Sequence, residues 1–349
     1  MRHPIWRHPE PRCYTDGPMQ SIPVLRTTAY QPVFEFVEAI GLSAESHFEA
    51  VGAPLHGYEE FDRLAPERPL WALLDRLRRH DGIEDVGFRL GASHCAVELP
   101  NVVPLLAGHQ SLYRTVGAFC DALGSHNSAW NFWLEERPGG LRVCRRRSVF
   151  AVGAWAMEQY AVCYMVDVVR MAAPLDWWPP EVWLQWEGPL LPAERQWLGE
   201  ARLHFGSPVT AIAIPRSLLA RRPHFSYRQR PPVFGTGTIS QGLAVTYREI
   251  LQTRLLERRT RLTHIARQLG VQPRTLQRAL ARRGTSHRTL LEEARREAVC
   301  ARLEDTDESI AEIARDLGFR HYQALSQSFK RWTGVSPSTY RRANRRRSS

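Results

Sequence analysis

A seven-residue motif occurs twice in the last third of the chain and constrains the fold more than any other feature. Ile265-Ala266-Arg267-Gln268-Leu269-Gly270-Val271 recurs as Ile313-Ala314-Arg315-Asp316-Leu317-Gly318-Phe319. In each copy an isoleucine and a leucine stand four positions apart, on one face of a helix. The glycine that follows tolerates the left-handed conformation of a tight turn. Each copy therefore predicts a short amphipathic helix that ends in a turn.

A second helix is predicted after each glycine, over Pro273 to Arg283 and over His321 to Trp332. Thr263 is expected to cap the first helix of the first copy, and Ser309-Ile310-Ala311-Glu312 matches a capping box. Two short helices joined by a glycine turn form a helix-turn-helix, whose second helix can enter the major groove of DNA. The repeat thus predicts two such units.

The charge of the chain is concentrated in the same region. Residues 246–349 carry 23 Arg or Lys against 11 Asp or Glu, a balance of +12, whereas the first 245 residues carry 24 against 25. A near-neutral body joined to a strongly basic domain is typical of a protein that binds a polyanion. A basic surface kept for solubility is the alternative.

The outer faces of the two second helices carry the candidate DNA contacts. Leu276 with Leu280, and Leu325 with Phe329, are predicted to face inward. Arginine can pair with two acceptors of guanine, and glutamine can pair with the edge of adenine. The candidates left outside, with the cations that follow them, are Arg274, Gln277, Arg278, His321, Tyr322, Gln323, Gln327, Lys330, Arg331 and Arg341. A helix over Leu290 to Leu303, about 22 Å long, is expected to hold the two units about one DNA turn apart.

Residues 246–343 resemble the AraC/XylS family of bacterial transcription regulators. The resemblance rests on Ile313-Ala314, Leu317-Gly318-Phe319, Phe329 to Pro337, Tyr340-Arg341, Arg274 to Arg278 and Gly284-Thr285-Ser286. It implies a transcription factor that reads two successive major-groove segments. Double-stranded DNA and RNA polymerase would be its partners, and activation would be its usual effect. The chain departs from the family at Gln327, where an arginine is frequent.

The first 220 residues predict one α+β domain. Apolar spacing is helical from Tyr30 to about Asn127 and again from Ala154 to Met171. A hairpin is predicted over Ala129 to Arg147, around Pro138-Gly139-Gly140. Short strands are expected at Glu181 to Trp186 and Val209 to Ile214, with a helix near Ala193 to His204 between them. The fold class is thus an α+β domain followed by an all-α domain with two helix-turn-helix units.

This region also resembles the sensing and dimerising domain of one AraC/XylS branch, through Gly87 to Gly91, Trp178 to Val182 and Phe205 to Val209. The resemblance implies a small-molecule effector, a homodimer, or both. An aromatic-lined pocket is one use of the many tryptophans, and core packing or a dimer face is the other. Arg145-Arg146-Arg147 is either a clamp for a carboxylate or charge that protects a strand edge. The candidate effector-binding residues are Trp130, Trp133, Trp155, Trp183, Trp186 and Arg145.

No catalytic motif, cofactor or metal site is predicted. The chain has no G-x-S-x-G, H-E-x-x-H or G-x-x-x-x-G-K motif, and its six cysteines form no C-x-x-C pair. A DNA-associated repair enzyme and a sensor that binds only protein are the alternatives to a transcription factor. No apolar run is long enough to span a bilayer and no signal peptide is evident, so a cytoplasmic, nucleoid-associated protein is expected.

The predicted boundaries follow these shifts in composition. Residues 1–20 are expected to be a disordered leader, 21–220 the sensing domain and 221–242 a linker rich in proline and glycine. The double helix-turn-helix domain is expected over 243–343, and 344–349 is a basic tail.

Overall fold

The structure, a computed structural model, describes residues 23–55, 63–93, 106, 108–126, 131–146, 153–224, 242–256 and 259–348. The predicted leader, most of the predicted linker and Trp130 lie outside these residues. Within the described ranges the chain divides into two compact units. The first unit contains Ala29–Ala53 and Glu67–Ile239, and the second contains Pro18–Thr28, Pro54–Pro66 and Ser240–Ser349.

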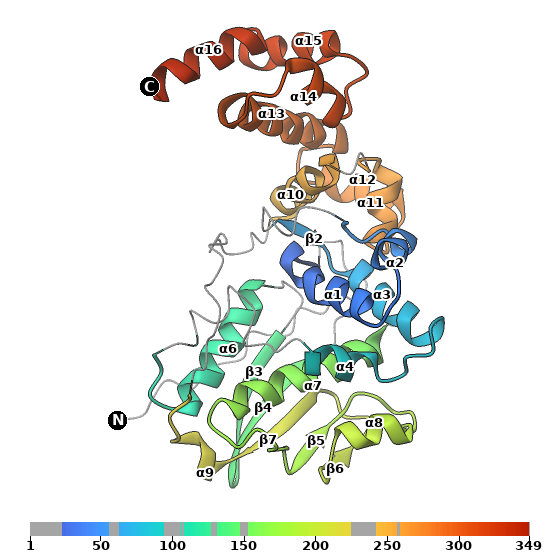
Figure 1. The fold of residues 1–349 in the computed structure, drawn as a ribbon, viewed down its shortest axis with the longest axis vertical. Helices are drawn as coiled ribbons and strands as arrows, with labels where there is room; N and C mark the ends of the chain where they lie inside the picture. The colour runs from blue at the N-terminus through green and yellow to red at the C-terminus, as the bar shows by residue number, and fades with distance from the viewer. Residues whose placement is uncertain are drawn as a thin grey trace. The chain divides into compact units, whose positions relative to one another are not determined.

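The first unit is built on a five-stranded sheet with the strand order β3-β4-β7-β5-β6 (Figure 1). Its strands are β3 Asn131–Arg137, β4 Gly140–Arg146, β5 Glu181–Trp183, β6 Arg202–His204 and β7 Thr210–Pro215. β5 and β6 run parallel, and the other neighbours run antiparallel. The predicted hairpin is confirmed for β3 and β4, which turn at Gly139 with a φ of +90°.

The first unit also contains helices, some of which pack on strands β3, β4 and β7 and others on those helices. They are α1 Gln31–Ala39, α2 Ala44–Val51, α3 Arg68–Arg79, α4 Val86–Ser93, α6 Leu112–His126, α7 Ala154–Arg170, α8 Pro192–Trp197 and α9 Arg216–Leu219. The predicted buried helix is confirmed as α7, which packs against β7 and is buried along nearly its whole length. No helix in the described part of the chain is long and apolar enough to cross a bilayer.

The helix predicted near Ala193 to His204 is wrong in its second half. α8 ends at Trp197, and the chain turns at Gly199, which has a φ of +53°. Arg202–His204 then forms β6, paired in parallel with β5. The apolar residues of this segment keep helical spacing over only a short stretch. Pairing with a strand about 20 residues away determined the conformation of its second half.

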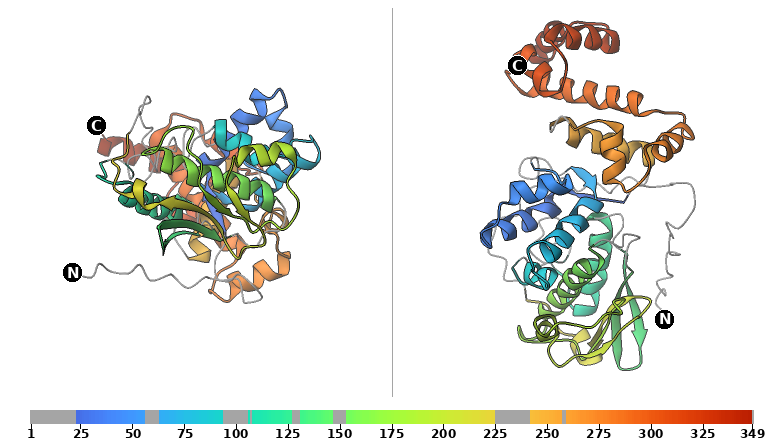
Figure 2. Two further views of the ribbon diagram at one scale, coloured as in Figure 1. Left: turned by 90° about the horizontal axis from the view of Figure 1, so that it is seen from below. Right: turned by 90° about the vertical axis from the view of Figure 1, so that its right-hand side faces the viewer.

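The second unit contains seven helices in the residues described. They are α10 Leu243–Leu256, α11 Leu262–Gln268, α12 Pro273–Ala281, α13 His287–Asp305, α14 Ile310–Asp316, α15 Tyr322–Thr333 and α16 Pro337–Ser348. The long helix α13 joins the pair α11–α12 to the pair α14–α15 (Figure 2). The predicted fold class is therefore confirmed, with α16 continuing through residue 348.

A two-stranded ribbon from the beginning of the chain completes the second unit. β1 Val24–Arg26 pairs antiparallel with β2 Leu64–Pro66, and β2 packs on α10. The buried hydroxyl of Thr253 on α10 donates a hydrogen bond of 2.9 Å to the carbonyl of Leu64. Arg63 donates to the carbonyl of Gln252 at 3.2 Å. The helical unit thus has a β component that comes from more than 170 positions earlier in the sequence.

We expect Thr253→Val to loosen the ribbon. Valine has a similar shape but cannot donate to the Leu64 carbonyl, and losing a buried hydrogen bond costs about 1–3 kcal/mol. Thermal unfolding of the second unit should shift down, and amide hydrogen exchange should speed up in β1 and β2. Thr263→Val is the matched control because Thr263 is exposed, and it should change neither measurement. Unchanged exchange in Thr253→Val would mean that this bond does not hold the ribbon.

Candidate nucleic-acid interface

The first helix-turn-helix consists of α11 and α12. The predicted inward residues are confirmed: Leu276 and Leu280 are fully buried, as is Ile265 of α11, the helix on which α12 packs. Gly270 makes the turn with a φ of +70°. The predicted cap is wrong, because α11 begins at Leu262 after Arg261 and has no side-chain cap. Thr263 is then already inside the first helical turn, where its hydroxyl cannot act as an N-cap.

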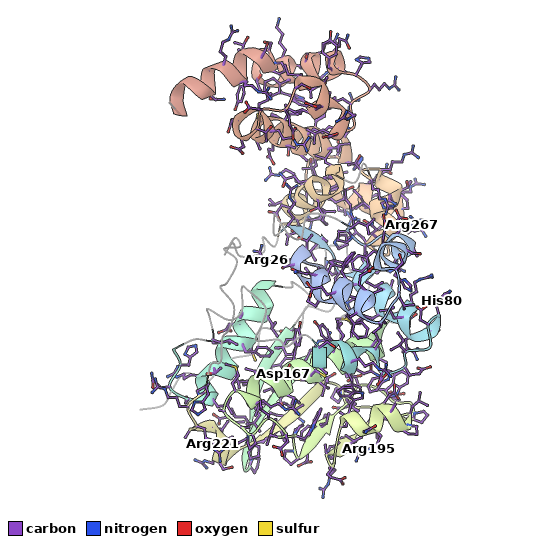
Figure 3. The ribbon with its side chains drawn as sticks, viewed as in Figure 1. Arg26, His80, Asp167, Arg195, Arg221 and Arg267 are labelled. Atoms are coloured by element: carbon purple, nitrogen blue, oxygen red, sulfur yellow. The ribbon has the colours of Figure 1, made fainter. Side chains whose placement is uncertain are left out.

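The outer face of α12 is made of polar side chains. Arg274, Gln277 and Arg278 are all exposed, at the i, i+3 and i+4 positions of one helix face. Neither arginine contacts a carboxylate among the described residues. Arg267, on the preceding helix, also lies at the surface (Figure 3). The structure therefore places the three predicted DNA-contacting residues of the first helix-turn-helix together on an accessible helix.

The second helix-turn-helix consists of α14 and α15. The predicted capping box is confirmed, with Glu312 N–H donating to Ser309 Oγ at 3.2 Å and Ser309 N–H donating to Glu312 at 2.7 Å. Gly318 makes the turn with a φ of +73°. Leu325 and Phe329 are fully buried, as predicted.

His321 serves as the N-cap of α15, a role that the sequence does not indicate. Its Nδ1 accepts a hydrogen bond of 3.1 Å from the backbone N–H of Ala324. One ring nitrogen is therefore committed to the helix, and only Nε2 is left to face outward. The sequence signal for such caps is strong for Ser, Thr, Asn and Asp and weak for His.

The outer face of α15 is accessible over three turns. Tyr322 has 52% of its surface exposed, and the other exposed side chains are Gln323, Gln327, Lys330 and Arg331. Arg331 lies 3.8 Å from Glu292 of α13. Arg341 on α16 is only half-buried overall, but its Nε and Nη2 atoms are enclosed and have no acceptor in the described part of the chain. It is less available to a ligand than the exposed Arg342 beside it.

The connecting helix α13 is held on both sides. Arg302 lies 3.1 Å from Asp316 of α14 and 3.2 Å from Glu308. Arg295 stacks over the ring of Phe319 at 5.1 Å. Toward α10, the buried Tyr247 shares a hydrogen bond of 2.9 Å with Nδ1 of His287. The predicted helix over Leu290 to Leu303 is confirmed and extends further at both ends, to about 28 Å at 1.5 Å per residue.

Residues 265–343 match the family model described as a helix-turn-helix domain, and the match runs from within α11 through α12, α13, α14 and α15 into α16. This domain is of the AraC type. An uncharacterized HTH-type transcriptional regulator of Mycobacterium bovis is 41% identical over 80 residues, which cover 23% of each chain. The HTH-type transcriptional regulator VirS of Mycobacterium tuberculosis is 40% identical over 77 residues, covering 22% of this chain and 23% of VirS. The similarity thus spans about a quarter of these relatives' length.

A solved structure matches along more of the chain. The transcriptional regulator CdpR from Pseudomonas aeruginosa aligns with 90% of this chain and 98% of its own, at 16% identity and a TM-score of 0.39.

His264 in the AraC-type domain is surrounded by arginines. Burial, and then the charges of Arg254, Arg267 and Arg259, lower the pKa of His264 to about 4. Arg267 Nη2 lies 3.2 Å from Nδ1 of the ring, and Gln268 Nε2 lies 3.1 Å from its Nε2. A protonated imidazole would be repelled in this position, so the folded domain keeps His264 neutral.

We expect the domain to lose stability as the pH falls from about 6.5 to about 4. In the unfolded chain His264 takes up a proton near its ordinary pKa of 6.5, whereas the folded domain resists protonation until about pH 4. Between these values the unfolded state binds more protons, so the free energy of unfolding decreases. Urea unfolding at several pH values should show this decrease, and His264→Gln should flatten it. An equally steep profile in His264→Gln would contradict this assignment.

The predicted effector-binding residues of strands β3, β4 and β5 do not all lie on the same face of the sheet. Trp133, Cys144, Ala211 and Trp183 follow one another across β3, β4, β7 and β5 as paired residues, so they share one face. Trp133 and Trp183 both pack on this row. Arg145 follows Cys144 along β4 and therefore points to the opposite face. The structure does not bring these three residues to one site.

Arg145 is neither on a strand edge nor at the surface. β4 lies between β3 and β7, and only 1% of Arg145 is exposed. Its guanidinium carbon lies 5.8 Å from the centre of the Trp71 ring. The strand-edge interpretation is therefore wrong for this residue, because the order of the strands placed β4 inside the sheet.

Trp155 and Trp186 do come together. Their rings stack at 5.1 Å, and the Trp155 indole donates to buried Glu194 at 2.6 Å. The carboxylate of Glu158, also buried, accepts from the backbone N–H of Trp186 at 3.1 Å and from Thr210. These polar atoms satisfy one another inside the core, which is how buried polar groups are normally stabilised.

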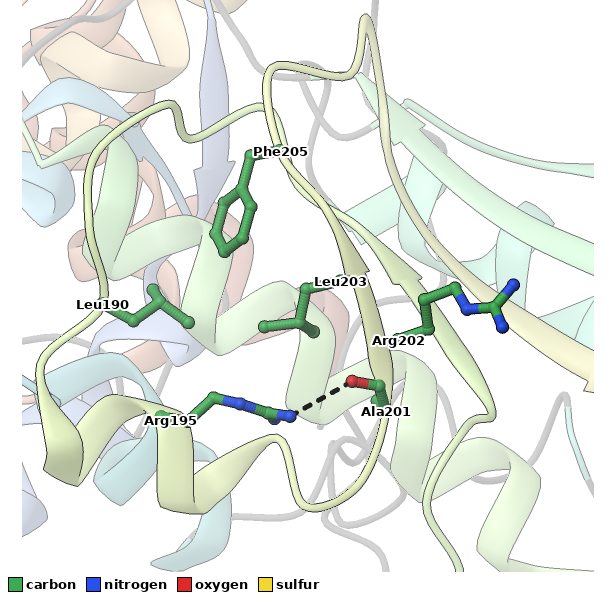
Figure 4. A pocket seen from close by; sticks show the side chains of 6 residues that line it. All are labelled: Leu190, Arg195, Ala201, Arg202, Leu203 and Phe205. Atoms are coloured by element: carbon green, nitrogen blue, oxygen red, sulfur yellow. Dashed lines mark hydrogen bonds between the residues drawn. The ribbon is translucent and has the colours of Figure 1, made fainter.

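A surface hollow of about 450 Å³ lies beside α8 and β6 (Figure 4). Arg195 reaches across its floor and donates to the carbonyl of Ala201 at 3.4 Å. Leu190, Leu203 and Phe205 line the apolar side. None of the predicted effector-binding residues lines this hollow.

Proposed function

We propose that the chain is a sequence-specific DNA-binding transcription factor. The observation that carries this proposal is the exposure of Arg274, Gln277 and Arg278 on the second helix of an AraC-type helix-turn-helix. These side chain types make bidentate contacts with guanine and adenine in the major groove. The balance of +12 over residues 246–349 would attract the phosphate backbone at long range.

The first unit is proposed to bind a small effector and to pair two subunits. It has its own sheet and its own buried helix α7, as an independently folded regulatory domain requires. The effector would act by binding the DNA-competent arrangement more tightly than the incompetent one. Activation through RNA polymerase is proposed on the resemblance to the AraC/XylS family.

A repair enzyme with a reactive cysteine is the rival function, and the described cysteines disfavour it. Burial raises the pKa of Cys144 to about 12, and it also raises the pKa of the buried thiols of Cys120 and Cys163. Cys300 is half-buried and its pKa is raised as well. Only the thiolate is a good nucleophile, so these four side chains are poorly suited to alkyl transfer. Cys13 and Cys95 lie outside the described residues.

The experiment is selection of bound sites from random DNA by the full-length protein, followed by salt titration of the selected duplexes. We expect a motif with two parts about one helical turn apart, and an affinity that falls steeply with salt. A sensor that binds only protein would give no salt-dependent affinity for DNA. Recovery of no motif would contradict sequence-specific binding.

Arg278→Ala should weaken binding to the selected site by about 1–3 kcal/mol and relax the base preference at one position. Arg216→Ala is the matched control, because Arg216 is an exposed arginine of the first unit. Fluorescence anisotropy on the selected duplex and on a scrambled one separates the two effects. If Arg278→Ala and Arg216→Ala both bind like the parent, Arg278 does not read a base.

A further inference from the structure

The two DNA-facing helices differ sharply in charge. Residues 259–291, around α11 and α12, contain eight arginines and no aspartate or glutamate. Residues 306–344, around α14 and α15, contain six basic and four acidic residues. The first helix-turn-helix is therefore strongly positive, whereas the second helix-turn-helix is close to neutral. The two copies of the repeat cannot offer DNA the same surface.

The difference extends to the side chains that face outward. The first two turns of α12 expose two guanidinium groups and one amide, from Arg274, Arg278 and Gln277. The first two turns of α15 expose a phenol and two amides, from Tyr322, Gln323 and Gln327. The cations of α15, Lys330 and Arg331, stand in its last turn. It is the N-terminal part of a recognition helix that contacts base edges in this type of docking.

The arginines of α12 have no ion pair among the described residues. Other arginines of the same domain are paired: Arg288, Arg302 and Arg315 each lie within 3.5 Å of a carboxylate. Arg274 and Arg278 have no such carboxylate among the described residues, and none stands between positions 259 and 291 of the sequence. Their donors are thus available to the O6 and N7 acceptors of guanine.

We propose that each subunit reads an asymmetric site, with guanine in the segment that faces α12 and A·T pairs in the segment that faces α15. Gln323 and Gln327 match the N6 and N7 edge of adenine, and the exposed ring of Tyr322 offers apolar contact to the thymine methyl group. This inference rests on the proposed function, because it specifies which sequence the same two helices recognise.

The test exchanges one side chain in each helix. The full chain, Arg278→Gln and Gln327→Arg are each used to select sites from the same random duplex library. The parent should select a guanine-containing segment and an A·T segment about one turn apart. Arg278→Gln should replace guanine by adenine in the first segment alone. Gln327→Arg should introduce guanine in the second segment alone, changing the preference for guanine over adenine there by about 5- to 150-fold.

Arg216→Gln in the first unit is the control and should select the parental motif. All three substitutions are at exposed positions, so matching thermal unfolding curves are expected. A parental motif with two like segments would overturn the asymmetric assignment. So would exchanges that alter the wrong segment or neither segment. In each case the recovered motif still upholds the proposed function. If no motif is selected, the proposed function fails and the assignment fails with it.

Discussion

Phe329→Ala should unfold the second helix-turn-helix before any other part of the AraC-type domain. Phe329 is fully buried on α15, and its ring meets that of Tyr340 on α16 edge to face at 5.3 Å. Removing a buried phenylalanine costs about 3–5 kcal/mol, through lost burial and the cavity that remains. A domain of this size has only about 5–15 kcal/mol to lose. Far-UV circular dichroism should therefore show a large drop in the melting temperature of this domain.

Tyr322→Ala is the matched control on the same helix. Tyr322 is an aromatic residue of similar size, but half of its surface is already exposed, so its removal should change the unfolding free energy by about 0.5 kcal/mol at most. Affinity for a selected DNA site should respond in both variants for different reasons. In Phe329→Ala the loss follows the melting curve, whereas in Tyr322→Ala it occurs in a folded domain. A parental melting curve for Phe329→Ala would show that α15 does not pack through this side chain.

The helix-turn-helix units could be predicted from the sequence because each of their signals is local. The spacing of Ile313 and Leu317, the glycine at 318 and the capping box at Ser309 all act within one or two helical turns. The inward positions of Leu325 and Phe329 follow from the same periodicity. His321, a predicted DNA contact, also caps the N-terminus of α15, and this role could not be predicted because histidine is a rare N-cap.

Pairings between distant segments could not be predicted in this way. The ribbon of β1 and β2 joins residues 24–26 to 64–66 and then packs on α10, and three-residue strands carry no periodic signal. The strand order likewise decided that Arg145 is buried and that Trp133 and Trp183 face away from it. A list of aromatic and basic residues cannot indicate which face of a sheet each one occupies until the register is known. For this reason the candidate DNA interface followed from the sequence more completely than the candidate effector site.

Gly87→Ala should strongly destabilise the first unit. Gly87 lies where α4 crosses α7, and a Cβ atom there would stand 2.0 Å from the carbonyl oxygen of Ala156. The clash is with backbone, so no side-chain rotation relieves it and α4 must move away from α7. The movement would also break the hydrogen bond from Gly87 N–H to Gln159. Overpacking of this kind costs about 3 kcal/mol, which lowers the melting temperature by about 6–12 °C in a unit of this size.

Gly117→Ala provides the control with the opposite sign. Gly117 lies inside α6, and a Cβ atom there would meet nothing within 4 Å. Alanine is preferred over glycine inside a helix by about 0.5–1 kcal/mol, so this variant should melt a few degrees above the parent. Both variants add the same methyl group, and tryptophan fluorescence reports on the first unit in both. If Gly87→Ala also raised the melting temperature, α4 and α7 would have to lie further apart than the structure has them. The close approach of the two helices would then not be the reason for glycine at position 87.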